Sequence, residues 1–232
     1  KNVLYFSYEE TAEAVAEKYL AGLVDEERSK LNFAKRNIEL SVEDLPSNLV
    51  VIEDKGSKAT LSNIKSQIQY VKTLNFFPEL VIVDGLNQLK LPKGLKVSGD
   101  NEKYEILTEE LKELLKEERL PGYATWQMNR LGFTSDLGGI ETIGKAIEVF
   151  QKADQVITFS QPPHLKDKME CVANLLKNRL GKKEIPLRVY YDPAKALFVE
   201  RGILDPTVLM SDSQKEKVKS SISSTREKLK ML

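Results

Sequence analysis

The 232-residue sequence predicts an α/β domain whose mostly parallel sheet has helices on both faces and an antiparallel C-terminal edge. Two observations predict this class. Short apolar runs alternate with amphipathic helical segments through most of the chain, which is typical of parallel strands joined by helices. The last third contains closely spaced strand-like runs, which indicate a hairpin pair or a meander at one edge of the sheet.

The individual elements follow in chain order from the spacing of apolar residues. Runs without polar alternation predict strands that are buried on both faces. The predicted strands are 2–7, 48–54, 79–85, 121–127 and 154–160, followed by a meander over 169–200. A periodicity of 3.6 residues predicts helices, which are 7–24, 57–74, 104–120 and 140–153. Ser7 or Thr11 is expected to cap the first of them.

Two of these helices carry a clear apolar stripe, which predicts the face that each turns toward the core. The stripes are Leu61, Ile64, Ile68 and Val71 in one helix, and Leu107, Leu111, Leu114 and Leu115 in the other. The segment 128–139 is rich in glycine and is expected to be a mobile loop, and 161–168 is expected to be a turn. Residues 1–202 are predicted to form the domain, and 203–232 a polar tail or loose helix.

Composition excludes several classes of protein. Lysine and arginine together equal aspartate and glutamate, 35 of each, so the chain lacks the strongly basic coat of many nucleic-acid-binding proteins. With one cysteine, Cys171, and one histidine, neither an internal disulfide nor a structural zinc site of the usual kind is expected. No apolar run reaches the roughly 18 residues that span a membrane, and no signal peptide is visible. These features suit a reducing cytoplasm.

Polar side chains follow three of the predicted strands at the points where they end. Glu9 follows the first strand, Asp84 ends the run LVIV, and Gln127 follows YATW. In open α/β sheets, ligands bind beyond the carboxyl ends of the strands. A nucleotide-hydrolysing site needs this set: a carboxylate for Mg²⁺, a second carboxylate to activate water, and an amide at the γ-phosphate.

Each of these three residues alone has an ordinary structural explanation, as a helix cap or a solvated loop group. The joint pattern carries more weight than its members. A second feature is the pair Lys177 and Arg179, which strand alternation puts on the same face. They either blunt an exposed strand edge or reach the γ-phosphate of a neighbouring subunit as a finger in trans.

With these segments in view, the sequence resembles the DnaB-like C-terminal ATPase domain of the replicative hexameric DNA helicases, which has a RecA-like fold. KNVLYFSYEETAEAVAEKYLA is similar to the segment after the phosphate loop, and LVIVDGLNQLK to the Walker B segment. LTEELKELLKEERLPGYATWQMNR, KADQVITFS and CVANLLKNRLGKKEIPLRVYYDPAKALFVE are similar to later segments of the domain. The resemblance covers about 1–202. Each motif is short, but the ordered set is specific.

The resemblance implies roles for five residues. Glu9 matches the catalytic glutamate, Asp84 the Walker B aspartate that binds Mg²⁺, and Gln127 the γ-phosphate sensor. Lys177 and Arg179 match the lysine and arginine finger that act in trans. The implied activity is ATP hydrolysis at subunit interfaces, driving translocation on single-stranded DNA.

The resemblance also implies partners. The DNA-binding loops of the family correspond here to 129–148 and 161–169. The cations available in these loops are Arg130, Lys145, Lys166 and Lys168. The expected partners are single-stranded DNA, further copies of the chain in a hexamer, and a primase or loader, in a bacterial or phage-infected cell. No membrane partner is expected.

Two features depart from the pattern of the family. The 232 residues contain no GxxxxGK[ST], so the phosphate-binding loop is missing. That loop was lost, lies before the numbered residues, or belongs to a second polypeptide. This chain alone is therefore expected to bind ATP poorly. Gly85 also replaces a common tyrosine after the Walker B aspartate, and the following loop is poor in arginine, which weakens the expectation of DNA contacts more than that of ATP contacts.

Two other functions are compatible with the sequence. Part of the resemblance extends to RecA-like, KaiC-like and RadA-like ATPases, so the chain is alternatively an ATPase without helicase activity. The missing phosphate loop also fits a non-catalytic scaffold or one half of a split ATPase. Trp126, next to Gln127, is expected to be a core residue, and Cys171 an inert buried thiol.

Overall fold

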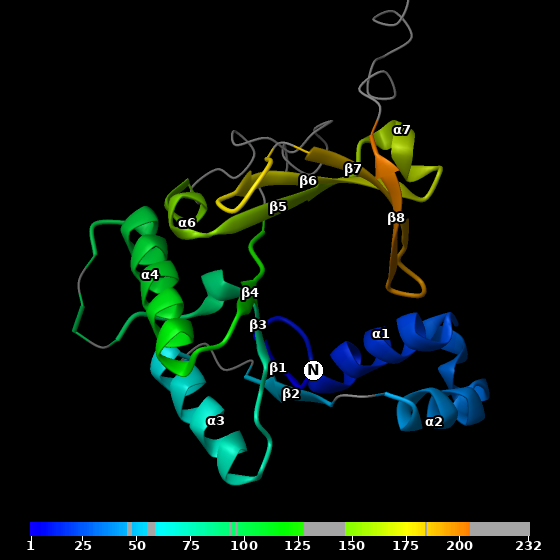
Figure 1. Cartoon of the computed structure of the whole chain (residues 1–232), viewed down its shortest axis with the longest axis horizontal. Coiled ribbons are helices and arrows are strands. Elements are labelled where there is room, and N and C mark those ends of the chain that lie inside the picture. The colour runs from blue at the N-terminus through cyan, green and yellow to red at the C-terminus, as the bar shows by residue number, and fades with distance from the viewer. Residues whose placement is uncertain are drawn as a thin grey trace, which may run out of the picture.

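The computed structural model describes residues 1–45, 48–54, 59–92, 94–95, 97–127, 147–183 and 185–204 (Figure 1). The predicted glycine-rich loop, the first half of the predicted helix 140–153 and nearly all of the predicted C-terminal tail lie outside these residues.

The first sheet is parallel and has the order β2-β1-β3-β4. Its strands are β1 (Val3–Ser7), β2 (Leu49–Glu53), β3 (Leu80–Asp84) and β4 (Gly122–Ala124). The predicted strand 121–127 is thus shorter than expected. Ser7 lies opposite Asp84 on the neighbouring strand, and Val83 lies opposite Ala124. The carboxyl ends of β1, β3 and β4 therefore meet at one edge.

Helices cover both faces of this sheet, as predicted (Figure 1). The helix α1 (Ala12–Val24) lies on one side, with Thr11 accepting a hydrogen bond from the Ala14 amide at its start. The helices α3 (Leu61–Thr73) and α4 (Asp100–Glu118) lie on the other side. Seven of the eight stripe residues predicted for them are buried, and Leu115 packs against the same core. That core also includes Leu4, Phe6, Val81 and Val83 of β1 and β3.

The segment between α1 and β2 forms two short helices that the sequence did not predict. They are a 3₁₀ helix, η1 (Arg28–Phe33), and α2 (Lys35–Glu43). Neither contains a buried residue, and Phe33 is 91% exposed. The two helices have six and nine residues, shorter than the window of roughly 11–18 residues over which a helical period is recognised, which explains why both were missed.

The antiparallel strands form a sheet of their own in the order β5-β6-β7-β8. They are β5 (Gln155–Ser160), β6 (Glu170–Asn178), β7 (Ile185–Asp192) and β8 (Leu197–Ile203). The α/β class and the antiparallel C-terminal part are confirmed. The predicted fifth strand, however, pairs antiparallel with β6 instead of joining the first sheet among the described residues.

Short helices and a hairpin connect the second sheet to its surroundings. The helix α6 (Ile147–Lys152) precedes β5, and α7 (Pro163–Lys166) replaces the predicted turn, with proline at its first position. The hairpin between β7 and β8 contacts the end of α1, where Lys195 Nζ lies 2.9 Å from Asp25 Oδ1. The contact holds one end of the second sheet against the first half of the chain.

Candidate active site

Glu9 and Gln127 come together beyond the carboxyl ends of β1 and β4. Gln127 Nε2 donates hydrogen bonds to both Glu9 carboxylate oxygens, at 3.0 and 3.2 Å. Both side chains are exposed, and they are 118 positions apart in the sequence. The convergence follows from the strand order, because parallel neighbours end at the same edge of a sheet.

Asp84 ends β3, the strand between β1 and β4, and hydroxyl groups hold both of its oxygens. Tyr5 Oη donates to Oδ2 at 2.8 Å, and Thr125 Oγ1 donates to Oδ1 at 2.7 Å. Thr125 Oγ1 also accepts a hydrogen bond from the Gly85 amide at 2.8 Å. Burial, and then the hydrogen bond to Asp84, raise the pKa of Tyr5 far above its usual value, so its hydroxyl stays protonated and donates.

Gly85 connects Asp84 to the Glu9 side of the site. Its φ is +94°, in the left-handed region that favours glycine. A β-carbon here would lie 3.1 Å from Glu9 Cγ and 3.3 Å from Gln88 Cγ. Gln88 Nε2 also donates to Glu9 Oε1, at a long 3.4 Å. The absence of a side chain at Gly85 thus leaves room for Glu9 beside the end of β3.

The two carboxylates suit a hard divalent cation. Neither Glu9 nor Asp84 forms an ion pair with a lysine or arginine in the described part of the chain. Their oxygens are ligands that Mg²⁺ prefers, although the described residues contain no cluster of three or more acidic, histidine or cysteine ligands. A cation here would therefore complete its shell with water and phosphate oxygens, as Mg²⁺ usually does at phosphates.

Comparison with solved structures relates the fold of this chain to that of DnaB-like helicase ATPase domains. One solved ATPase domain superposes with a TM-score of 0.71 at 15% sequence identity, covering 86% of this chain and 74% of that one. A DnaB-like replicative helicase, described with its interactions with primase, gives the same TM-score and identity, covering 86% of this chain and 50% of that one. The chain has the fold of the DnaB-like helicase ATPase domains. It spans half the length of the second relative.

Comparison of the sequence alone gave no match. No protein-family model matches the chain, and no curated protein matches it. At 15% identity, the similarity to the DnaB-like domains therefore concerns the fold, and the chemistry has to be argued from the residues of this chain.

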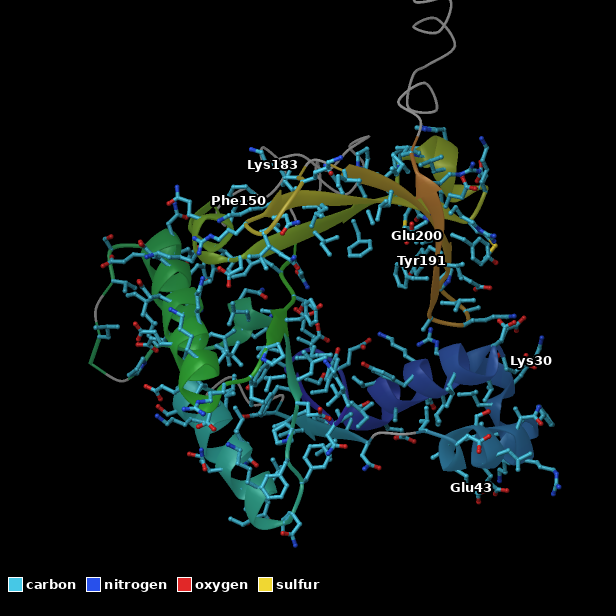
Figure 2. All side chains as sticks on the ribbon, viewed as in Figure 1. Lys30, Glu43, Phe150, Lys183, Tyr191 and Glu200 are labelled. Carbon is cyan, nitrogen blue, oxygen red and sulfur yellow. The ribbon has the colours of Figure 1, made fainter. Side chains whose placement is uncertain are left out.

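Lys177 and Arg179 lie at the end of β6, and their contacts are away from Glu9. Lys177 Nζ donates to the carbonyls of Phe150 and Gln151 at 2.7 and 2.8 Å, and Arg179 Nη2 reaches the same Gln151 carbonyl at 3.2 Å. The two side chains thus share one side, as predicted. They bind the C-terminal carbonyls of α6, where cations are favoured; Figure 2 labels Phe150 on this helix.

Asp154 pairs with two cations near the end of β6, Arg179 and Lys112. It accepts hydrogen bonds from Lys112 at 2.6 Å and from Arg179 at 2.9 Å, and both lower its pKa, Lys112 more strongly. Burial, and then the Arg179 charge, lower the pKa of Lys177. A pocket of about 170 Å³ beside Arg179 is lined by charged side chains of α4 and α6 and contains neither Glu9 nor Asp84. A role for Lys177 and Arg179 in trans stays a prediction.

The expected DNA-binding cations are only partly described. Lys166 ends α7 and Lys168 follows it, and both side chains are exposed. Arg130 and Lys145 lie outside the described residues. Trp126 packs against the core of the first sheet and makes an edge-to-face contact with Tyr104, at 4.4 Å between ring centroids, so its prediction as a core residue is confirmed. None of the described helices combines the length and apolar character that crossing a bilayer requires.

Proposed function

We propose that this chain is the motor domain of a ring-forming, ATP-dependent DNA helicase that translocates on single-stranded DNA. The observation that carries the proposal is the pairing of Glu9 with Gln127 next to Asp84, at one edge of a sheet with the DnaB-like fold. These side chains supply a base, an amide and a cation-binding carboxylate within one constellation.

Glu9 is the general base in this proposal. Its carboxylate is exposed to the water that it has to deprotonate. Gln127 donates hydrogen bonds to both carboxylate oxygens, which orients the base. Contact of the Gln127 amide with a γ-phosphate would compete with this hydrogen bond and release Glu9 to the attacking water. The same amide would thereby report whether the phosphate is present.

Asp84 is the cation-binding residue. Its carboxylate is half-buried and held by two neutral donors, so its negative charge is available to a cation. Mg²⁺, when bound, would neutralise charge on the phosphates of ATP. Lys177 and Arg179 of a neighbouring subunit would meet the γ-phosphate from the other side, which requires an oligomer, with a hexamer as the proposed form.

The phosphates also need a backbone cradle and a lysine, which these 232 residues do not supply as GxxxxGK[ST]. In the proposal, a segment outside the 232 residues or a second polypeptide brings this loop. Lys166 and Lys168, with Arg130 and Lys145, are proposed to contact DNA phosphates, and few cations per subunit suffice when several subunits surround one strand. A primase or loader is a further proposed partner.

A second candidate is an ATPase of the same fold without helicase activity, or a non-catalytic half of a split ATPase. The few cations on the described residues of 161–169, which are Lys166 and Lys168, favour it. The two candidates differ in their response to single-stranded DNA.

The test is ATP hydrolysis by the full-length gene product, with and without single-stranded DNA. Glu9→Gln is expected to lower turnover by about 100-fold or more, because it removes the base. Glu10→Gln is the matched control, since the neighbouring Glu10 pairs with Lys18 on α1 instead of Gln127. DNA stimulation that Glu9→Gln abolishes would support the motor. Hydrolysis indifferent to DNA would favour the second candidate, and no hydrolysis would favour the split form.

A further inference from the structure

The hydroxyl groups around Asp84 come from both neighbouring strands. Tyr5 lies opposite Ile82 in the register of β1 and β3, so Asp84 is its diagonal neighbour on the same face of the sheet. Thr125 follows β4 directly, where Val83 lies opposite Ala124, and its amide donates to the Val83 carbonyl at 3.0 Å. The strand pairing itself therefore aims both hydroxyls at the end of β3.

The contacts of these hydroxyls fix the carboxylate group without neutralising it. Each Asp84 oxygen accepts one hydrogen bond, at 2.8 Å from Tyr5 and 2.7 Å from Thr125. Two donors on opposite oxygens prevent the carboxylate from turning about its terminal bond, and each oxygen keeps a lone pair for another partner. An ion pair with lysine or arginine would instead compete with a cation for the same charge.

The two donors are held in place by further contacts. The ring of Tyr5 packs edge-to-face on Tyr19 of α1, at 6.4 Å between centroids. Thr125 Oγ1 accepts a hydrogen bond from the Gly85 amide, which leaves its own hydrogen for Asp84. Each hydroxyl therefore has one favoured direction in which to donate.

We propose that Tyr5 and Thr125 are positioning residues that orient the Asp84 carboxylate for a divalent cation. This inference rests on the proposed function, since it assigns Asp84 to the cation. Partners that orient a metal-binding carboxylate typically change metal affinity by 10-fold or more when they are removed. The loss of either hydroxyl is thus expected to weaken cation binding without removing a ligand.

The test is a titration of the 232-residue chain with Mn²⁺ alone, in which electron paramagnetic resonance measures the free ion. Tyr5→Phe is expected to raise the Mn²⁺ dissociation constant by about 10-fold. Tyr8→Phe is the matched control, because Tyr8 is a buried tyrosine just beyond the same strand whose hydroxyl makes no hydrogen bond to Asp84 among the described residues. Its backbone amide donates to the Asp84 carbonyl at 3.1 Å, and the substitution leaves that contact unchanged. Thr125→Val should weaken binding as Tyr5→Phe does, and Thr125→Ser, which keeps the hydroxyl, should restore it.

Asp84→Asn separates the failure of this inference from the failure of the proposed function. If Asp84→Asn abolishes Mn²⁺ binding while Tyr5→Phe and Thr125→Val bind as the wild type does, the positioning role is overturned and the cation site stands. If Tyr8→Phe weakens Mn²⁺ binding as much as Tyr5→Phe does, the loss reflects a general destabilisation of the fold and not the hydroxyl on Asp84, and the inference also fails. Wild-type binding that does not depend on Asp84, or no binding, would overturn the cation site and the inference together.

Discussion

The two sheets of the molecule differ in how their sites are supported. The first sheet rests on one continuous core cluster of 15 buried residues, which joins β1 and β3 to α3 and α4. The described part of the second sheet has three separate clusters, with one, three and three buried residues. The side chains of Phe159 and Phe198 are about half exposed on it, and Tyr191, labelled in Figure 2, stacks on Phe198.

Because of this difference, the acidic and the basic residues of the candidate site are held in place in different ways. Glu9 and Asp84 are placed by β1 and β3, which contribute residues to the main core, and Gln127 follows Trp126, which packs against that core. These side chains bind one another or groups of the same sheet. Lys177 and Arg179 are placed by a helix end and a surface aspartate. The acidic half of the candidate site, Glu9, Asp84 and Gln127, is therefore preorganised within the chain. The basic half, Lys177 and Arg179, depends on contacts at the surface, where the Arg179 and Asp154 side chains are 49% and 59% exposed.

A matched pair of core truncations gives the largest expected effect. Leu107→Ala removes a fully buried side chain from the large core, and we expect it to lower the free energy of unfolding by about 4–5 kcal/mol. Leu176→Ala, in the smallest cluster of the second sheet, should cost about 2–3 kcal/mol, because looser surroundings collapse more easily into the space. Urea unfolding measures both, and equal costs would contradict the difference between the sheets.

The turn after Asp84 gives an intermediate effect. Gly85→Ala forces a left-handed residue to carry a β-carbon 3.1 Å from Glu9 Cγ, and we expect a loss of about 2 kcal/mol in unfolding free energy and a displaced Glu9. Gly94→Ala is the control, since it has the same φ of +94° with nothing within 4 Å. It should cost about 1 kcal/mol. If only Gly85→Ala also reduces ATP turnover by the full-length protein, the close approach to Glu9 matters for the site.

The sequence was sufficient to predict that the acidic residues and the glutamine converge, for a physical reason. Glu9, Asp84 and Gln127 each follow an apolar strand, and parallel strands share an edge, so local patterns predict a long-range convergence. Tyr5 and Thr125 were missed because their contacts with Asp84 depend on how the strands pair. Tyr5 is 79 positions from Asp84 in the sequence, and Thr125 is 41 positions from it. No local pattern marks a hydroxyl that a distant strand will aim at a carboxylate.

The same limit explains what was missed elsewhere in the fold. The strand character of β5 was evident, but its antiparallel pairing with β6 depends on which strand lies beside it. The helix α2 has nine residues, which are too few turns for its helical period to stand out in the sequence. Both errors concern segments outside the large core, where burial constrains the pattern of apolar residues least.

Asp154→Asn gives the smallest expected effect and addresses the basic half directly. The pKa of Asp154 is lowered, chiefly by the hydrogen bond from Lys112, so its ion pairs contribute stability above the usual aspartate pKa of about 4. That contribution is lost as the pH falls through the lowered pKa. The side chain is 59% exposed, so solvent screening limits the contribution at pH 7 to less than about 1 kcal/mol.

The difference in unfolding free energy between wild type and Asp154→Asn should therefore shrink toward zero as the pH falls below the usual aspartate pKa of about 4 and through the lowered pKa of Asp154. It should also shrink in concentrated salt. Urea unfolding at several pH values measures it. If the two unfolding free energies differed by several kcal/mol at every pH and salt concentration, Asp154 would hold Arg179 as firmly as the core holds Glu9. The basic half would then be as preorganised as the acidic half, and Arg179 could turn to a neighbouring subunit only by breaking a strong contact.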